Sequence, residues 1–249
     1  MKPTFTLLAA LLLAFSQNPL QGETTTTKTS VSEARKKWQE MRFGLFIHWG
    51  VYSIPAGVWK GKQIEKLGEQ IQRHAFIADD EYQDIARQFN PVKFNADDIA
   101  TLAKEAGMKY IVLTVKHHDG FCMYDSKFTD FDIIDFTPFK RDILKELSIA
   151  CKKQGVKLGI YYSTPDWHFT GPQPEVNPFD KKISVFAKVS KKQEEFQVNQ
   201  LRELMQNYGD ICEVFFDMGE PTLAQSKNFR KAVKDLQPNC KINGRIMNN

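Results

Sequence analysis

The sequence of 249 residues predicts an α/β fold built on a parallel sheet. Three observations support this prediction. Short apolar runs of strand length alternate along the chain with longer segments whose apolar residues recur at helical spacing. A glycine follows nearly every predicted helix, and polar residues follow every predicted strand. This alternation is typical of βα units, in which right-handed crossovers join parallel strands.

The predicted strands are rich in β-branched and aromatic residues and are bounded by turn-forming residues. They cover residues 43–49, 110–115, 157–163, 212–217 and 240–243. No glycine-rich phosphate-binding motif follows the first of them, so a nucleotide-binding fold has little support. A (β/α)8-like TIM barrel fits best, because polar residues cluster at the strand ends. A complete barrel takes about 250 residues or more, so we expect a barrel truncated after about five βα units.

The predicted helices cover residues 32–41, 81–89, 95–106, 142–155, 190–207 and 226–236. Asp79, Asn95 and Asp142 are the predicted N-caps, because a side-chain oxygen at that position accepts a hydrogen bond from the first helical turn. Residues 51–78, between the first strand and the second helix, show neither the helical nor the strand period of apolar residues, so we predict a long irregular loop there. A loop of this length inside a compact domain is usually functional or a lid.

The composition is that of an ordinary folded protein, and it limits the classes of function. Hydrophobic residues make up 42% and charged residues 26% of the chain, which argues against disorder. The net charge of +4 comes from scattered Lys and Arg, and no basic stripe marks a nucleic-acid binder. The four cysteines are widely spaced without a CxxC pair, so neither a metal finger nor a disulfide is predicted.

The N-terminus has the pattern of a secretory signal peptide. Lys2 precedes an apolar run over residues 7–15, and small residues allow cleavage after Ser16. The run is too short to span a bilayer, and no cysteine lies near the cut to carry a lipid anchor. We therefore assign residues 1–22 to the signal peptide and the start of a spacer, and residues 23–249 to the barrel. We expect export to the periplasm, the exterior or the lysosome, with no membrane anchor.

The stretch most indicative of function is residues 109–125. An apolar strand there ends in His117, His118 and Asp119. In parallel α/β proteins, chemistry sits at the carboxyl ends of the strands. A polar exit loop is the simpler explanation, and a single histidine would not contradict it. Two adjacent histidines followed by an aspartate favour a functional site.

The other strand ends carry comparable side chains. Together the strand ends supply His48, Trp49, His117, His118, Tyr161, Tyr162, Asp217 and Arg245. A sugar site needs such a set, because hydroxyls require hydrogen-bond partners, ring faces stack on aromatic rings, and an oxocarbenium-like transition state requires a nearby carboxylate. Each residue alone has an ordinary structural explanation, such as a helix cap for Asp217. Their shared position at strand ends favours the site.

Six blocks of sequence around these residues resemble the motifs of retaining α-L-fucosidases, glycoside hydrolase family 29. The blocks are FGLFIHWG from Phe43, KHHDGF from Lys116, DS from Asp125, TPFKRD from Thr137, GIYYS from Gly159 and FFDMG from Phe215. The resemblance runs over about residues 31–249. It implies exo-hydrolysis of terminal α-L-fucosyl residues from fucosylated glycans or oligosaccharides, by a retaining double displacement that uses no cofactor and no metal.

The resemblance also implies roles for individual residues. Asp217 matches the catalytic nucleophile. The matches to substrate-binding positions are His48, Trp49, Glu69, His117, His118, Tyr161 and Arg245. Tyr162 is the alternative to Tyr161. The family's general acid/base is a glutamate in a variable loop, which we expect beyond Asn249, and Glu69 is the weaker candidate within the chain.

The sequence leaves two other functions open. A metal-dependent barrel hydrolase could use His48, His117, His118 and Asp217, although the first strand ends in His-Trp-Gly and lacks the HxH pattern of many barrel metal enzymes. The chain could also be an inactive, truncated sugar-binding remnant that keeps the pocket and lacks the acid. Indifference of the activity to chelators would remove the metal-dependent alternative.

Overall fold

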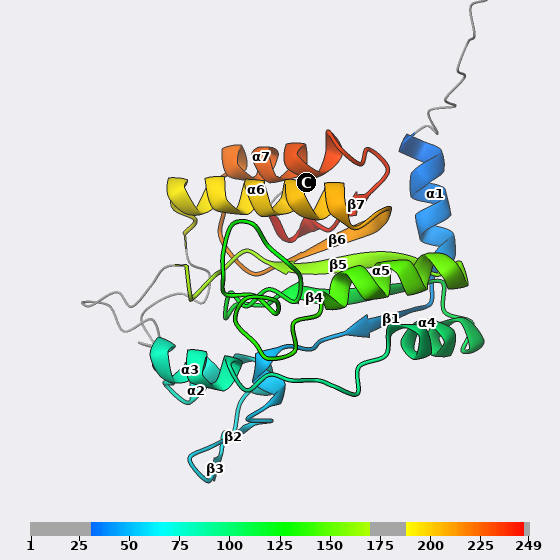
Figure 1. The fold of residues 1–249 in the computed structure, drawn as a ribbon. Coiled ribbons are helices and arrows are strands. Elements are labelled where there is room, and N and C mark those ends of the chain that lie inside the picture. The colour runs from blue at the N-terminus through cyan, green and yellow to red at the C-terminus, as the bar shows by residue number, and fades with distance from the viewer. Residues whose placement is uncertain (1–30, 170–187, 247–249) are drawn as a thin grey trace, which may run out of the picture.

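The computed structural model describes residues 31–169 and 188–246, and five parallel strands form its main sheet. They are β1 (Gly44–Ile47), β4 (Tyr110–Lys116), β5 (Lys157–Ser163), β6 (Ile211–Asp217) and β7 (Lys241–Ile242). Their order in the sheet is β1-β4-β5-β6-β7, which is also their order along the chain (Figure 1). The predicted α/β fold with a parallel sheet is confirmed. Within the described residues β1 and β7 are the two edges of this sheet, and no closed barrel is seen.

A helix directly precedes each of the strands β4 to β7, and the longer connection from β1 to β4 also contains two further helices, α2 (Ile71–His74) and α3 (Asp79–Ala86). The connecting helices are α4 (Ala96–Glu105), α5 (Ile143–Gln154), α6 (Lys191–Asn207) and α7 (Leu223–Lys234). α4 contacts α5, and α6 contacts α7, so the helices pack as neighbours in two pairs (Figure 1). The last of them starts three residues before the predicted start, because Thr222 and Gln225 form a capping box.

Two of the three predicted N-caps are confirmed. The Asn95 side-chain oxygen accepts hydrogen bonds from the amides of Asp97 and Asp98, and the Asp142 carboxylate accepts one from the Lys145 amide. The prediction for Asp79 was wrong. Helix α3 (Asp79–Ala86) already includes Asp79, and Ala78 occupies the cap position without a side-chain bond.

The two faces of the sheet carry different side chains, as the alternation along each strand requires. One face packs into the hydrophobic core, and it presents Leu113, Val115, Leu158, Ile160, Tyr162, Val214 and Phe216. Phe46, Tyr161 and Phe215 alternate with these residues and contact one another through their rings on the other face. The carboxyl ends of the strands, where the polar residues were predicted to form the site, lie next to this second face.

Residues 51–78 are less irregular than the sequence indicated. They contain the hairpin of β2 (Val58–Trp59) and β3 (Lys62–Gln63), the 3-10 turns η1 (Val51–Ser53) and η2 (Gly68–Gln70), and the short helix α2 (Ile71–His74). The hairpin extends away from the main sheet (Figure 1). Strands of two residues are too short to show an alternating pattern, which explains why the sequence did not reveal them.

Helix α1 (Val31–Met41) lies at the amino ends of the strands, opposite the loops that follow them (Figure 1). The indole nitrogen of Trp38 donates a hydrogen bond of 3.3 Å to Glu213 on β6 and ties the helix to the sheet. No helix among the described residues is both long and apolar enough to cross a bilayer. The predicted signal peptide lies outside the described residues.

Candidate active site

Asp217, the last residue of β6, is the centre of a group of polar side chains. Its side chain is 13% exposed. Tyr161 on the neighbouring strand β5 donates its phenolic hydrogen to Asp217 Oδ2 at 2.6 Å. The guanidinium of Arg245, in the turn η3 (Gly244–Ile246) after β7, donates to Oδ1. These two donors orient the carboxylate and leave part of it open to solvent.

The turn after Asp217 fixes the carboxylate further. Met218 and Gly219 both have positive φ, at 52° and 91°. A Cβ atom on Gly219 would lie 2.7 Å from Cβ of Thr164, so only glycine fits there. The Thr164 amide donates to the Asp217 carbonyl at 3.1 Å. The end of β6 is therefore packed tightly against the loop that follows β5.

Three histidines surround the same carboxylate. His118 Nε2 lies 3.8 Å from Asp217 Oδ2. The ring of His117 lies 4.1 Å from the ring of His118 and 4.9 Å from that of His48, measured between centroids. The Tyr161 ring lies 5.2 Å from His48. The structure thus brings together the imidazoles, the phenol and the carboxylate that the sequence placed at separate strand ends.

Burial keeps these imidazoles uncharged. The pKa of His118 falls to about 4, because desolvation outweighs the attraction of Asp217. The pKa of His117 falls well below its usual range through burial and through the neighbouring His118 and His48. Burial also lowers the pKa of His48, although Glu69 and Asp217 oppose the shift. A neutral imidazole has one nitrogen that accepts a hydrogen bond, so these rings can serve as acceptors near neutral pH.

Two of the imidazole nitrogens have no hydrogen-bond partner in the part of the chain that the structure describes. His117 Nδ1 and His118 Nε2 are buried and make no hydrogen bond within the described residues. An unsatisfied buried polar atom costs about 1–3 kcal/mol, so such atoms in a native site call for an explanation. A ligand with several hydroxyl groups would satisfy both. Within residues 31–169 and 188–246, no group of three or more His, Cys, Asp or Glu side chains is arranged to hold a metal ion.

An aromatic wall beside the carboxylate was missed by the sequence prediction. Phe46 is 45% exposed and lies 5.4 Å from Phe215 and 6.1 Å from Tyr161, between ring centroids. Phe46 precedes His48 by two residues, and Phe215 precedes Asp217 by two. Because side chains two apart in a strand share a face, this spacing was the signal available in the sequence.

The structure does not bring every predicted residue into this group. The ring of Trp49 packs against Phe89 and Phe94 at 5.6 and 5.8 Å, against the hydrophobic core. Tyr162 lies on the helix-covered face, where its hydroxyl donates to Gln200 at 2.7 Å. Tyr161, and not its alternative Tyr162, therefore faces Asp217.

Glu69 lies in the turn η2 and enters the site from residues 51–78. Its side chain is half-buried, and its charge acts on the imidazole of His48 and on the phenol of Tyr52. The neighbouring Gln70 amide approaches the Met218 sulfur at 3.9 Å, which links this turn to the one after Asp217. The segment of residues 51–78 therefore places the Glu69 carboxylate at the edge of the candidate active site.

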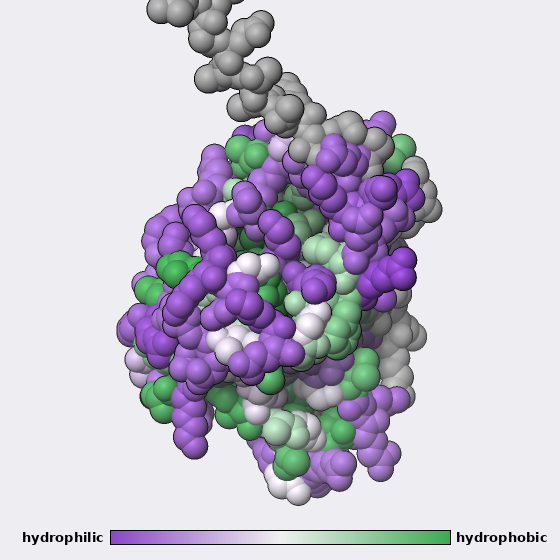
Figure 2. All heavy atoms as spheres, turned by 90° about the vertical axis from the view of Figure 1, so that its right-hand side faces the viewer, coloured by the Kyte–Doolittle hydropathy of each residue, from purple (hydrophilic) through white to green (hydrophobic). Residues whose placement is uncertain are grey.

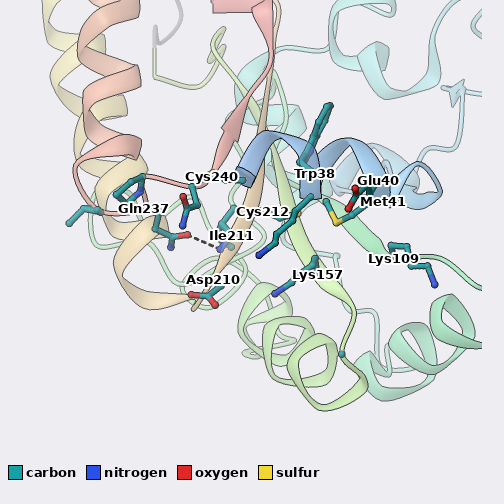
Figure 3. Close-up of a pocket in the computed structure, with 16 residues that line it drawn as sticks. Trp38, Glu40, Met41, Lys109, Lys157, Asp210, Ile211, Cys212, Gln237 and Cys240 are labelled. Carbon is teal, nitrogen blue, oxygen red and sulfur yellow. Dashed lines mark hydrogen bonds between the residues drawn. The ribbon is translucent and has the colours of Figure 1, made fainter. Parts of the chain in front are cut away.

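A hollow of about 680 Å³ lies at the opposite, amino-terminal ends of the strands. Figure 2 looks onto this end of the molecule, and Figure 3 shows the lining residues, including Trp38, Lys109, Lys157 and Cys240. The dashed line in Figure 3 is the 2.8 Å bond that the Ile211 amide donates to the Gln237 side chain. None of the predicted site residues lines this hollow. The candidate active site is thus defined by its side chains at the other end of the sheet.

The family model for alpha-L-fucosidases matches residues 11–249. The chain belongs to this family. Human plasma alpha-L-fucosidase is 34% identical over 183 residues, which cover 69% of this chain and 37% of the human protein. Bovine tissue alpha-L-fucosidase is 35% identical over 160 residues, or 61% of this chain and 34% of the bovine protein. The chain therefore spans little more than a third of the length of these curated fucosidases.

Solved fucosidase structures share the fold. Unliganded alpha-L-fucosidase AlfC from Lactobacillus casei is 38% identical, with a TM-score of 0.72 over 86% of this chain and 69% of that chain. The fucosidase from Vibrio sp. strain EJY3 is 32% identical, with a TM-score of 0.72 over 86% of this chain and 38% of that chain. A mutant of AlfC has also been solved in complex with Fuca(1,6)GlcNAc and with 4-nitrophenyl-a-L-fucopyranoside.

Proposed function

We propose that this chain forms the fucose-binding and nucleophile-bearing part of a retaining alpha-L-fucosidase. The observation that carries the proposal is the Asp217 carboxylate at a strand end, oriented by Tyr161 and Arg245. It is faced by Nε2 of the neutral His118, which has no hydrogen-bond partner among the described residues. Fucose is a 6-deoxy sugar, so it presents hydroxyls and one methyl group. The imidazoles can bond the hydroxyls, and the aromatic wall of Phe46 and Phe215 suits the methyl.

The proposed reaction has two displacements. In the first, an Asp217 carboxylate oxygen bonds to the anomeric carbon as the glycosidic bond breaks, and the departing oxygen takes a proton from a general acid. In the second, a water oxygen attacks the same carbon while the deprotonated acid takes a proton from that water, the ester bond to Asp217 breaks to restore its carboxylate, and the anomeric configuration is retained. Our first candidate for the general acid/base is a glutamate outside the described residues, and Glu69 is the weaker candidate among them.

The wider setting is also a proposal. Fucosylated glycans or oligosaccharides are the proposed substrates, and the AlfC complex with Fuca(1,6)GlcNAc supports this class. We propose that the parallel sheet is part of a (β/α)8 barrel, because its strands follow chain order and a helix directly precedes each of β4 to β7. Export remains a proposal that rests on the apolar run over residues 7–15.

Replacing Asp217 by glycine tests the function. Asp217→Gly should lower turnover of an activated aryl α-L-fucoside by several orders of magnitude, because no nucleophile remains to form the covalent intermediate. An aryl fucoside with a good leaving group is suitable because it needs little protonation. Added azide should then rescue turnover and give the inverted β-fucosyl azide.

The matched control is Glu220→Gln, which removes the exposed carboxylate three residues away. It should leave turnover within about twofold, because the Glu220 side chain is exposed and has no part in the proposed displacements. Substantial residual activity of Asp217→Gly, or azide rescue only in a Glu220 variant, would show that the nucleophile is a different carboxylate. Turnover that stops with a chelator would instead favour a metal-dependent hydrolase.

A further inference from the structure

His118 has two possible partners for the single ring proton of its neutral form. Its Nδ1 lies 2.6 Å from Ser163 Oγ, and its Nε2 lies 3.8 Å from Asp217 Oδ2. A neutral imidazole carries its proton on one nitrogen only. The position of that proton therefore decides whether the nitrogen facing the site donates or accepts a hydrogen bond.

The surroundings of Ser163 decide between the two positions. Ser163 Oγ lies 2.6 Å from the carbonyl oxygen of Pro165, which can only accept. The one hydroxyl hydrogen of Ser163 is used in that bond, so the oxygen must accept from His118 Nδ1–H. This leaves Nε2 without a proton, buried, and without a partner within the described residues.

We propose that Ser163 is a positioning residue that fixes His118 in the Nδ1–H tautomer, so that Nε2 accepts a hydrogen bond from a sugar hydroxyl. The identity of this ligand rests on the proposed function, whereas the tautomer does not. Without the Ser163 oxygen, the carboxylate of Asp217 would be the remaining acceptor near the ring. The proton would then move to Nε2, where it would block the acceptor and neutralise part of the charge on Asp217.

The loop that carries Pro165 is held firmly against the histidines. The Trp167 amide donates to the His118 carbonyl at 2.8 Å. The ammonium of Lys116 lies 2.8 Å from the Asp166 carboxylate, and both side chains are buried. A Cβ atom on Gly120 would lie only 2.4 Å from Asp166 Oδ1, so the two loops are in close contact. The Ser163–Pro165 geometry is therefore fixed by the packing around it, which makes the tautomer a property of the fold.

The tautomer can be read directly by NMR of the full chain with 15N-labelled histidine. The protein has five histidines, and His118→Gln assigns the signals of His118 by their loss. We expect the wild type to carry the proton on Nδ1, and Ser163→Ala to carry it on Nε2 or to exchange between both nitrogens. The control Ser148→Ala removes a hydroxyl on α5 that donates to the Lys145 carbonyl, and it should leave the His118 signals unchanged.

Titration of the same samples with L-fucose separates this inference from the proposed function. Fucose should shift the His118 signals of the wild type, and Ser163→Ala should weaken fucose binding about tenfold, the loss expected for one hydrogen bond. If fucose shifts no histidine signal but the wild type is Nδ1-protonated, the proposed function fails and the tautomer stands.

Three outcomes would overturn the inference. The first is a wild type with the proton on Nε2, a measurement that needs no variant to fold. The second is a Ser163→Ala variant that keeps the Nδ1 proton. The third is a Ser163→Ala variant that switches tautomer yet binds fucose as tightly as the wild type.

Discussion

Two ion pairs act on the charge of His118, one through Lys116 and the other through Asp217, and their burial differs sharply. Lys116 and Asp166 are 0% and 2% exposed at 2.8 Å, and the ammonium sits over the rings of Tyr162 and Phe196. Arg245 and Asp217 are 58% and 13% exposed, at the end of the other face of the sheet. Asp166 lies three residues after the end of β5, and Asp217 is the last residue of β6.

The difference in burial gives the two pairs different roles, structural for Lys116–Asp166 and, as we propose, catalytic for Asp217. Burial alone would lower the pKa of Lys116, but Asp166 and the neighbouring Tyr162 and Cys122 outweigh it, so the pKa is raised and the ammonium stays charged. The buried Lys116 ammonium can hold the end of β4 to the loop that carries Asp166, but it cannot contact a substrate. Asp217 keeps an open side, and a carboxylate that attacks a sugar needs one.

The largest effect expected from this comparison is on stability. Lys116→Met should lower the free energy of unfolding by about 3–5 kcal/mol, because it leaves the buried Asp166 carboxylate without its cation. Arg245→Met is the matched variant and should cost about 0–1 kcal/mol, since its pair is largely exposed. Urea denaturation of both variants at neutral pH measures the two values. Equal losses would mean that burial does not distinguish the pairs.

The pH dependence of the free energy of unfolding shows whether His118 is a buried neutral imidazole or an imidazolium paired with Asp217. Its pKa of about 4 in the folded protein lies below the ordinary 6.5, so the unfolded chain binds more protons between these values. Stability contributed by His118 should therefore rise from pH 4 to 6.5 and stay constant above. Relative to His118→Gln, the wild type should gain about 3 kcal/mol over this window, at about 1.4 kcal/mol per pKa unit.

Denaturation of wild type and His118→Gln at several pH values checks the sign. If His118 were an imidazolium paired with Asp217, its folded pKa would be raised and not lowered. The difference in stability would then be present at low pH and lost as pH rises above 6.5. His74→Gln, in the short helix α2, provides a histidine control away from the buried group.

The smallest effects are expected for the adjacent tyrosines Tyr161 and Tyr162, which are also the most closely matched pair of variants. Tyr161→Phe removes the donor to Asp217 and should lower turnover of an aryl fucoside about tenfold, with little effect on stability. Tyr162→Phe removes the donor to Gln200 and should cost about 1 kcal/mol of stability while turnover stays the same. Kinetics and denaturation on both variants measure the two effects. A loss of turnover in Tyr162→Phe would break the division between the two faces of the sheet.

Most of the sheet could be predicted from the sequence, and the reasons are local. β5 has the predicted bounds, because an apolar run between Gly155 and Pro165 leaves little choice. The caps at Asn95 and Asp142 followed from side-chain chemistry alone. Asp79 failed as a cap because the first turn begins one residue earlier, which packing decides.

The sequence predicted which strand ends form the site, but it did not predict the direction of every side chain there. Parallel topology brings Asp217 and His118 to one edge, as predicted. Side-chain direction is harder, since neighbours in a strand point to opposite faces and only the register separates Tyr161 from Tyr162. The part played by Ser163 depends on the direction of a backbone carbonyl two residues away, and no sequence pattern encodes that direction.

The nucleophile can be identified directly by trapping it. A 2-deoxy-2-fluoro-α-L-fucosyl fluoride has an activated leaving group, and its fluorine slows the second displacement, so the covalent ester should accumulate. Peptide mass spectrometry of the treated protein should find the fucosyl label on Asp217, and Asp217→Gly should remain unlabelled. A label on Glu69 or Glu220, or undiminished labelling of the variant, would contradict the assignment of Asp217 as nucleophile.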